Sequence, residues 1–318
     1  MPKNVAIGLG LMEFPFSGVA GFWRWVDLCE AGGVDSLWQT DRLLSRDPML
    51  ECMTAMAAQA GRTRRLKFGM NVVSLALRDP VLVAKQCATI DVLSEGRLLP
   101  AFGIGSPRAP EWAALHIDTT TRGRKTDEGL EIIRRLWRED SVDFIGQHYR
   151  LTAASISPKP VQADLPMWIG GGSAAAIRRT ARIGTGWQGG PETPAQAERI
   201  VGAIKAAAVD AGRSIEADHY GASFPFYFGH LAHPLLERAT AAYRQRTGND
   251  ALGYFAIGDA GTILERIVQY VSAGASKFIL RPMGDSGEEV LTQTRRLIEE
   301  VLPKVASRWP RMAKAAAK

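Results

Sequence analysis

Short apolar runs alternate with longer amphipathic segments along most of the chain. Eight of these runs are rich in β-branched and aromatic side chains and are bounded by turn-forming residues, which is typical of buried strands. Because nearly every position in them is apolar, both faces of the predicted sheet must be covered, which favours parallel strands. The runs span residues 5–11, 36–40, 66–73, 98–104, 167–170, 184–188, 220–228 and 277–281.

Helical patterns fill the intervals between the predicted strands. Apolar side chains recur at helical spacing from Phe22 to Cys29 and stop at the glycine pair that begins with Gly32. Pro80 is expected to open another helix, and Asp259 is expected to cap one. Strand and helix alternate about eight times, so the sequence predicts the α/β class and favours a closed (β/α)8 TIM barrel over an open sheet.

Two stretches, residues 140–162 and residues 229–257, depart from this alternation. We interpret them as insertions after the fourth and seventh strand–helix units of one domain that spans residues 1–318. A single barrel domain of this length is ordinary, since such domains typically have about 250 residues and grow further by insertion. The basic tail at residues 309–318 is expected to be frayed.

Composition argues against nucleic acid and membrane as binding partners of this chain. The chain has 39 Lys and Arg against 33 Asp and Glu, but the basic residues occur in scattered pairs mixed with acids, which indicates solvated helix faces more than a nucleic-acid surface. No apolar run is long enough to cross a bilayer, and the first residues lack a cleavable signal pattern. The three cysteines have no metal-ligand spacing and suit a reducing compartment. We therefore expect a cytoplasmic protein that binds neither nucleic acid nor membrane.

Two glycine-rich turns follow predicted strands, at the end where barrel active sites lie. Residues 169–173 read IGGGS and precede a helical pattern. Gly171 and Gly172 would let the backbone approach a phosphate, Ser173 would add a hydroxyl, and the helix start would favour the anion. A tight strand-to-helix turn would need the same glycines, so both interpretations stay open.

The other turn, which comes earlier in the chain, has Gly105 and Ser106, with Arg108 close by. An arginine beside close-approach glycines is suited to meet the same phosphate from the other side. An exposed arginine on an ordinary turn is the alternative. Two such turns on neighbouring strand ends favour a phosphate site more than either turn alone.

Asp41 and Arg42 follow the second predicted strand. The carboxylate is a candidate proton carrier, but we favour a structural ion pair between these two residues because the sequence shows no perturbed pKa.

His230 and His233 have a spacing that two metal ligands can use, yet no cysteine or clustered carboxylate accompanies them, so no metal site is expected. Aromatic residues near the predicted mouth, Tyr254 among them, are candidates for lining a pocket.

Residues 63–105, TRRLKFGMNVVSLALRDPVLVAKQCATIDVLSEGRLLPAFGIG, resemble the bacterial luciferase-like family of flavin- or deazaflavin-dependent oxidoreductases. IGGGS at 169–173 and the segment 258–280 match the same family, and the matches run along nearly the whole chain. The resemblance implies a barrel that holds the flavin ring near the ends of its first four strands, with a bulge or non-prolyl cis peptide near Asn71 and Val72. It also implies a homodimer.

The family resemblance implies that the flavin ring would lie against Asn71, Val72 and Ser74. The cofactor phosphate would lie against Ser106 with Arg108 and against the turn that ends at Ser173, where the glycines had already indicated a phosphate.

The chain also departs from the family. Many relatives have an acid followed by histidine after the second strand, where this chain has Asp41 followed by Arg42, and deazaflavin users often have an acid after the fourth strand, where it has Pro107 and Arg108. The leading hypothesis is a monooxygenase that uses O2 and FMN reduced by a separate reductase to oxidise a small or medium organic substrate, with Asp41 and Arg42 touching that substrate. A deazaflavin-dependent hydride-transfer enzyme and a non-catalytic flavin-binding relative are the alternatives.

Overall fold

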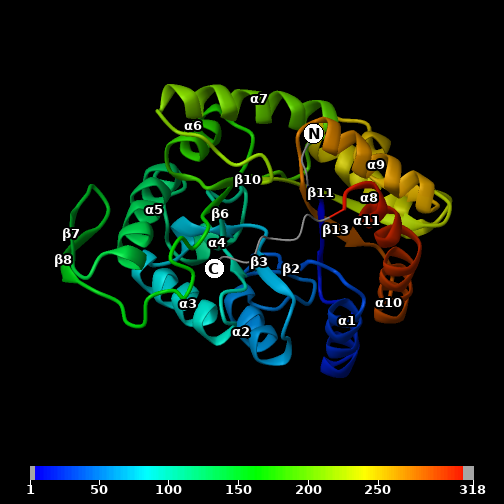
Figure 1. The fold of residues 1–318 in the computed structure, drawn as a ribbon, viewed down its shortest axis with the longest axis horizontal. Coiled ribbons are helices and arrows are strands. Elements are labelled where there is room, and N and C mark those ends of the chain that lie inside the picture. Colours follow the sequence, from blue (N-terminus) through cyan, green and yellow to red (C-terminus); the bar gives the residue numbers. More distant parts are fainter. Residues whose placement is uncertain (1–3, 311–318) are drawn as a thin grey trace.

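A curled, mostly parallel sheet runs through the centre of the protein (Figure 1). The computed structural model describes residues 4–310, and within them the sheet has eleven strands. The predicted α/β class is confirmed, and each of the eight predicted strand segments contributes to this sheet. The strands are β1 (Ala6–Gly10), β2 (Ser36–Gln39), β3 (Lys67–Met70), β4 (Val73–Ser74), β5 (Leu98–Leu99), β6 (Ala101–Gly103), β9 (Trp168–Gly170), β10 (Gly186–Gln188), β11 (Tyr220–Phe228), β12 (Ala256–Gly258) and β13 (Lys277–Pro282).

The order of the strands makes the sheet curl back on itself. Along its path the strands follow one another as β4, β6, β9, β10, β11, β13, β1, β2, β3 and β5, and β12 pairs with β11 at the side. The path begins and ends in two chain segments, 67–74 and 98–103, that also pair with each other: β3 pairs with β5, and β4 pairs with β6. The carboxyl ends of all these parallel strands therefore face one side of the molecule, where the predicted site lies.

Helices surround the sheet, and several begin at the predicted caps (Figure 1). The carboxylate of Asp79 accepts the N–H groups of Val81 and Leu82 at the start of α3, and Asp259 accepts the N–H of Thr262 at the start of α9. The helices are α1 (Val19–Ala31), α2 (Cys52–Arg62), α3 (Pro80–Leu93), α4 (Glu111–Ala114), α5 (Arg122–Arg138), α6 (Ala174–Ile183), α7 (Pro194–Asp210), α8 (Pro234–Thr247), α9 (Ala260–Ser272), α10 (Gly287–Arg296) and α11 (Leu302–Arg308), with 3-10 turns at Leu75–Leu77 and Ala251–Gly253 and a π-helical turn at Leu297–Val301.

The two stretches interpreted as insertions differ in structure. Residues 140–162 contain the antiparallel hairpin of β7 (Val142–Ile145) and β8 (Arg150–Ala154), which projects beside α5 (Figure 1). Residues 229–257 contain α8, and they end within β12, a strand that the sequence did not predict. Their status as insertions stays a prediction.

The chain end departs from the expected frayed tail at its first residue. The Trp309 side chain is 9% exposed and belongs to the main apolar core. Residues 311–318, the rest of that tail, lie outside the described residues.

Two large apolar clusters fill the space between sheet and helices, and a third fills the inside of the curled sheet. The inner cluster contains Trp38 and Trp168 with Ile279. All three cysteines are buried and form no disulfide. Within residues 4–310, no helix combines the length and the apolar character that a membrane crossing requires.

Gly69 leaves the room that Trp38 needs inside the sheet. A Cβ atom at position 69 would lie 2.2 Å from the carbonyl oxygen of Leu99 and 2.7 Å from the Trp38 ring. We expect Gly69→Ala to lower the free energy of unfolding by at least about 2 kcal/mol, because neither the strand nor the indole has space to move. Urea denaturation followed by circular dichroism measures this change.

Gly202→Ala is the matched control. Gly202 lies within α7, and a Cβ there would meet nothing within 4 Å. This substitution should raise the free energy of unfolding by about 0.5–1 kcal/mol through helix propensity. Equal effects of the two substitutions would contradict the tight packing around Trp38.

Candidate functional site

The two glycine turns begin at neighbouring strand ends. In the pairing of β6 with β9, Phe102 stands opposite Ile169, so Gly103 and Gly170 follow at the same level. The turns that lead to Ser106 and Ser173 therefore leave the sheet side by side. A common anion for both turns stays a prediction.

The Val72 side chain explains why the first position of each turn, Gly103 and Gly170, is glycine. A Cβ on Gly103 would lie 2.6 Å from Cγ2 of Val72, and a Cβ on Gly170 would lie 3.0 Å from the same side chain. The peptide bond between Asn71 and Val72 is cis, at the position that the family resemblance implied. Gly103 and Gly170 thus make room for a protein side chain, and only the later glycines remain for a ligand.

In the first turn, protein side chains contact the backbone, whereas the Arg108 side chain has no ion-pair partner among the described residues. Gly105 has a φ of +69°, and a Cβ there would lie 2.8 Å from the hydroxyl of Ser74. The indole N–H of Trp112 donates to the carbonyl of Ser106 at 2.6 Å. The Arg108 side chain is exposed and forms no ion pair with any described residue, so its guanidinium is available to an anion.

The second turn has one unused hydroxyl proton. Gly171 has a φ of +101°, and its carbonyl accepts the indole N–H of Trp187 at 2.9 Å. Ser173 caps α6, because its Oγ accepts the N–H of Ala176 at 3.2 Å. A hydroxyl that accepts through oxygen still has its own proton to donate. Ser173 can therefore cap the helix and bind an anion at the same time.

A polar cavity of about 470 Å³ lies against this second turn. Gly172 and Ser173 line it together with the side chains of Glu192 and Arg199. None of the residues of the first turn lines this cavity. Of the predicted phosphate ligands, the structure thus places two in a cavity, while Ser106 and Arg108 lie outside it.

Glu192 carries a half-buried carboxylate at the wall of this cavity. Its Oε2 accepts the N–H of Gly190 at 2.5 Å. Burial raises the pKa of Glu192 above its ordinary value of 4.5, and the backbone N–H groups of Glu192 and Gly190 offset only part of that effect. A ligand phosphate bound here would have this carboxylate as a neighbour.

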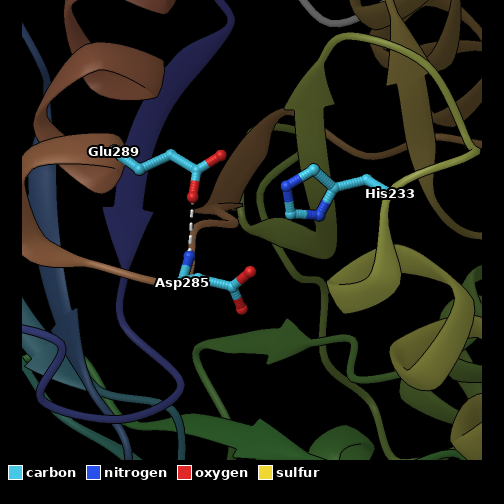
Figure 2. A group of neighbouring side chains, drawn as sticks. All are labelled: His233, Asp285 and Glu289. Atoms are coloured by element: carbon cyan, nitrogen blue, oxygen red, sulfur yellow. Dashed lines mark hydrogen bonds between the residues drawn. The ribbon is translucent and has the colours of Figure 1, made fainter.

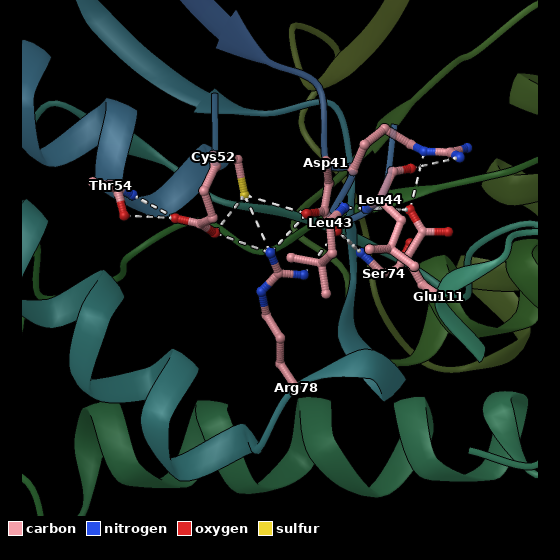
Figure 3. Close-up of polar contacts among 10 residues, drawn as sticks. Asp41, Leu43, Leu44, Cys52, Thr54, Ser74, Arg78 and Glu111 are labelled. Carbon is pink, nitrogen blue, oxygen red and sulfur yellow. Dashed lines mark hydrogen bonds and ion pairs between the residues drawn. The ribbon is translucent and has the colours of Figure 1, made fainter. Parts of the chain in front are cut away.

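Asp41 pairs with Arg78, not with Arg42 as we expected (Figure 3). The guanidinium of Arg78 donates to both carboxylate oxygens, at 2.7 and 2.9 Å, and the exposed fraction is 1% for the Asp41 side chain and 10% for that of Arg78. Asp41 Oδ2 also accepts the N–H of Ser74 at 2.8 Å. The predicted structural ion pair exists, but with a partner from before α3.

The Asp41–Arg78 pair is the centre of a larger network. Arg78 also donates to Glu51 Oε1 at 3.0 Å, and the thiol of Cys52 donates to Asp41 Oδ1 at 3.5 Å. The network joins the segments that follow β2 and β4 to the start of α2. Both oxygens of Asp41 are thereby engaged, which suits a residue that holds the backbone and does not suit a proton carrier.

Arg42 instead pairs with Glu111 at the start of α4, and Figure 3 shows this glutamate beside Leu43 and Leu44. The Nε of Arg42 lies 3.1 Å from Glu111 Oε1, and the same oxygen accepts the N–H groups of Leu43 and Leu44 at 3.3 and 3.4 Å. The Glu111 side chain is 2% exposed, and its Oε2 is buried without a partner. This contact closes the loop after β2 against the loop after β6.

Sequence reasoning missed both Arg78 and Glu111. Arg78 precedes Asp79 and Pro80, and that run was interpreted only as a helix start. Glu111 lies far from Arg42 in the sequence and forms no motif with it. The only available signal for Glu111 was an acid in the loop after the fourth strand, three residues beyond Arg108.

His233, Asp285 and Glu289 lie together at the start of α8, with ligand atoms within 4.8 Å of one another (Figure 2). Their atoms already have protein partners. Glu289 accepts from the Tyr227 hydroxyl and from the N–H of Asp285, both at 2.7 Å, and His233 Nδ1 accepts the N–H of Leu235 at 3.3 Å. The structure thus places two carboxylates beside His233, which the sequence analysis did not expect, and the absence of a metal here stays a prediction.

Comparison with known proteins gives a consistent family. The family model described as luciferase-like monooxygenase matches residues 16–254. An uncharacterised protein of Mycobacterium tuberculosis is 33% identical over 168 residues, a match that covers 52% of this chain and only 57% of that protein. An F420-dependent glucose-6-phosphate dehydrogenase of Amycolatopsis mediterranei is 25% identical over 316 residues, covering 87% of this chain and 91% of the relative.

The fold also matches solved structures. The oxygenating constituent of 3,6-diketocamphane monooxygenase from Pseudomonas putida, a type II Baeyer-Villiger monooxygenase solved with FMN, superposes with a TM-score of 0.76. The superposition covers 95% of this chain and 98% of that one at 15% sequence identity. At this identity the likeness establishes a shared fold.

Loss of Arg78 should leave the Asp41 carboxylate buried and unpaired. We expect Arg78→Met to lower the free energy of unfolding by about 3–5 kcal/mol, measured by urea denaturation. The control is Arg24→Met, which removes an exposed ion pair with Glu288 and should change the stability very little. A loss for Arg78→Met no larger than that of the control would contradict the role of this pair.

The raised pKa of Glu192 predicts a fall in stability with rising pH. Because the folded state holds the Glu192 proton more tightly than the unfolded chain, this group stabilises the fold below pH 4.5 and loses that contribution as the pH rises through its raised pKa. Thermal unfolding from pH 4.5 to pH 7 should therefore show a smaller decrease in stability for Glu192→Gln than for the wild type. Parallel pH profiles of the two proteins would show that Glu192 is not the group responsible.

Proposed function

Because this chain belongs to the luciferase-like monooxygenase family, we propose that it is a monooxygenase that uses externally reduced FMN and O2 to oxidise a small or medium organic substrate. Family members are oxidoreductases, and the named relatives and neighbours include both monooxygenases and F420-dependent dehydrogenases. The choice of FMN and of oxygen transfer is the proposal.

The observation that carries the proposal is the pair of adjacent turns. Ser106 and Ser173 offer hydroxyl groups at neighbouring strand ends, and Arg108 offers a guanidinium that no described carboxylate neutralises. Hydroxyl and guanidinium donors beside a helix start are the groups that bind a phosphate monoester. The residues present therefore fit the phosphate of FMN.

The remaining residues would place and shield the ring. In this proposal Asn71, Val72 and Ser74 back the ring, and the Asp41–Arg78 pair fixes that segment through the N–H of Ser74. Asp41 is then a positioning residue and not a proton carrier. Reduced FMN supplies the electrons for activating O2, and the protein holds the ring away from water.

Two further expectations belong to the proposal. The Pseudomonas putida neighbour is described as an oxygenating constituent, which supports a separate reductase that delivers the reduced flavin. The family resemblance supports a homodimer. Both are accessible to pull-down and light-scattering experiments on the purified protein.

A deazaflavin-dependent hydride-transfer enzyme is the second candidate, and Glu111 favours it. The chain has Pro107 and Arg108 where deazaflavin users often have an acid, but Glu111 follows three residues after Arg108, at the start of α4, and pairs with Arg42. The matching dehydrogenase of Amycolatopsis mediterranei is named as F420-dependent. Arg108 would then meet the acidic tail of that cofactor in addition to its phosphate.

Anaerobic titration with reduced FMN, reduced riboflavin and the reduced deazaflavin coenzyme tests the proposal. We expect FMN to bind about tenfold or more tightly than riboflavin, since only FMN carries the phosphate. Arg108→Ala and Ser173→Ala should each weaken FMN binding by about tenfold and leave riboflavin binding unchanged. Arg295→Ala, which removes an exposed arginine of α10, is the control.

The other outcomes decide between the candidates. A preference for the deazaflavin would replace the monooxygenase with the hydride-transfer enzyme. Tight flavin binding without turnover by any reductant would support a non-catalytic relative. Failure to bind either cofactor would overturn the proposed function.

A further inference from the structure

Arg281 lies at the carboxyl end of β13, on the opposite side of the mouth from the phosphate turns. Ile279, two residues earlier, packs inside the curled sheet with Trp38 and Trp168. Because side chains alternate along a strand, Arg281 is directed to the same inner side, at the level where the active site lies. Along the sheet, β10 and β11 separate β13 from β9, and β1 and β2 separate it from β3.

The charge of Arg281 has no counter-charge in the described part of the chain. Arg281 Nη2 donates to the hydroxyl of Tyr254, and the guanidinium lies 5.8 Å from the centre of that ring. No carboxylate among residues 4–310 forms an ion pair with Arg281, and its Nε is buried without a hydrogen-bond partner. A half-buried cation without an anionic partner is costly, and a bound anion would offset that cost.

Tyr254 holds the arginine in place at this side of the mouth. The Tyr254 side chain is 1% exposed and stacks on Tyr243 with 4.8 Å between the ring centres. Its hydroxyl donates to the carbonyl of Gly190 at 3.3 Å, and that carbonyl also accepts the hydroxyl of Ser223 at 3.1 Å. The hydroxyl that receives Arg281 is therefore fixed from β10 and β11.

We propose that Arg281, held by Tyr254, is a binding site for the anionic group of the substrate, so that the substrate carries a carboxylate or a phosphate. The proposal rests on the proposed function for the position of the cofactor, whose phosphate has its own ligands at Ser106 and Ser173. An anion at Arg281 would lie across the mouth from that phosphate. The planar guanidinium can bind either oxyanion with two hydrogen bonds.

Binding of 4-fluorobenzoate, followed by fluorine NMR, tests this site without turnover. The titrations are run on the full chain, with and without FMN, so that the phosphate turns are filled in one series and free in the other. We expect the probe to bind the wild type, to bind Arg281→Met at least about tenfold more weakly, and to bind Arg281→Lys with intermediate affinity. Arg295→Met, on the outer face of α10, is the matched control and should bind like the wild type.

Competition distinguishes the two sources of the anion. Displacement of the probe by inorganic phosphate in the FMN-loaded protein would support a phosphorylated substrate, and displacement by acetate alone would support a carboxylate. Thermal unfolding of each variant shows whether Arg281→Met is folded. If Arg281→Met does not fold, the probe affinity of Arg281→Lys is compared with that of the wild type instead.

Two results would overturn the proposal: absence of probe binding to the wild type, or equal affinity of the wild type and Arg281→Met. The proposed function fails separately. If neither FMN nor the deazaflavin binds while the probe still distinguishes Arg281→Met from the wild type, the anion site stands and the cofactor assignment is wrong.

Discussion

A carboxylate removed from water must be paired, and at Asp41 this requirement joins several loops at the carboxyl ends of the strands. Asp41 lies after β2, its partner Arg78 lies before α3, and the N–H of Ser74 completes the set. Three segments that are distant in the sequence are therefore fixed to one buried charge pair. The segment of Asn71 and Val72 lies between two of these anchors, and the glycines of both turns are shaped to the Val72 side chain. In the proposed function, the position of the flavin ring against this segment would depend on that one pair.

The sequence predicted the elements well because their signals are local. Continuous apolar runs identified the strands, and Pro80 and Asp259 identified helix starts through groups only a few residues away. The strand that was missed, β12, has three residues and too little length for a pattern. The prediction failed where the cause was tertiary: nothing local distinguishes Arg78 from Arg42 as the partner of Asp41, because the choice depends on how β2 and α3 pack. The position of the cis peptide followed from the family resemblance and not from any property of Asn71 or Val72.

The glycine turns show how one pattern can have two causes. Their spacing was consistent with a phosphate site or with a tight turn. In the structure, some of the glycines make room for protein packing and another lines a cavity. Gly103 and Gly170 accommodate Val72, whereas Gly172 lines a polar cavity next to Ser173. At the carboxyl ends of the strands, the hydroxyl groups of the two turns and Arg108 lie on one side, and Arg281 with Tyr254 lies on the other. Between them, the contact of Arg42 with Glu111 closes two loops over the ends of β2 and β6.

If the protein is the monooxygenase proposed above, its three buried cysteines bear on how it would tolerate the hydrogen peroxide that reduced flavin and O2 can release. Burial raises the pKa of the thiols of Cys29, Cys52 and Cys87, and the nearby carboxylates of Asp41 and Glu51 raise that of Cys52 further. Hydrogen peroxide reacts with thiolates and hardly at all with thiols, so none of the three offers it a nucleophile. We therefore expect these thiols to form sulfenic acid only slowly.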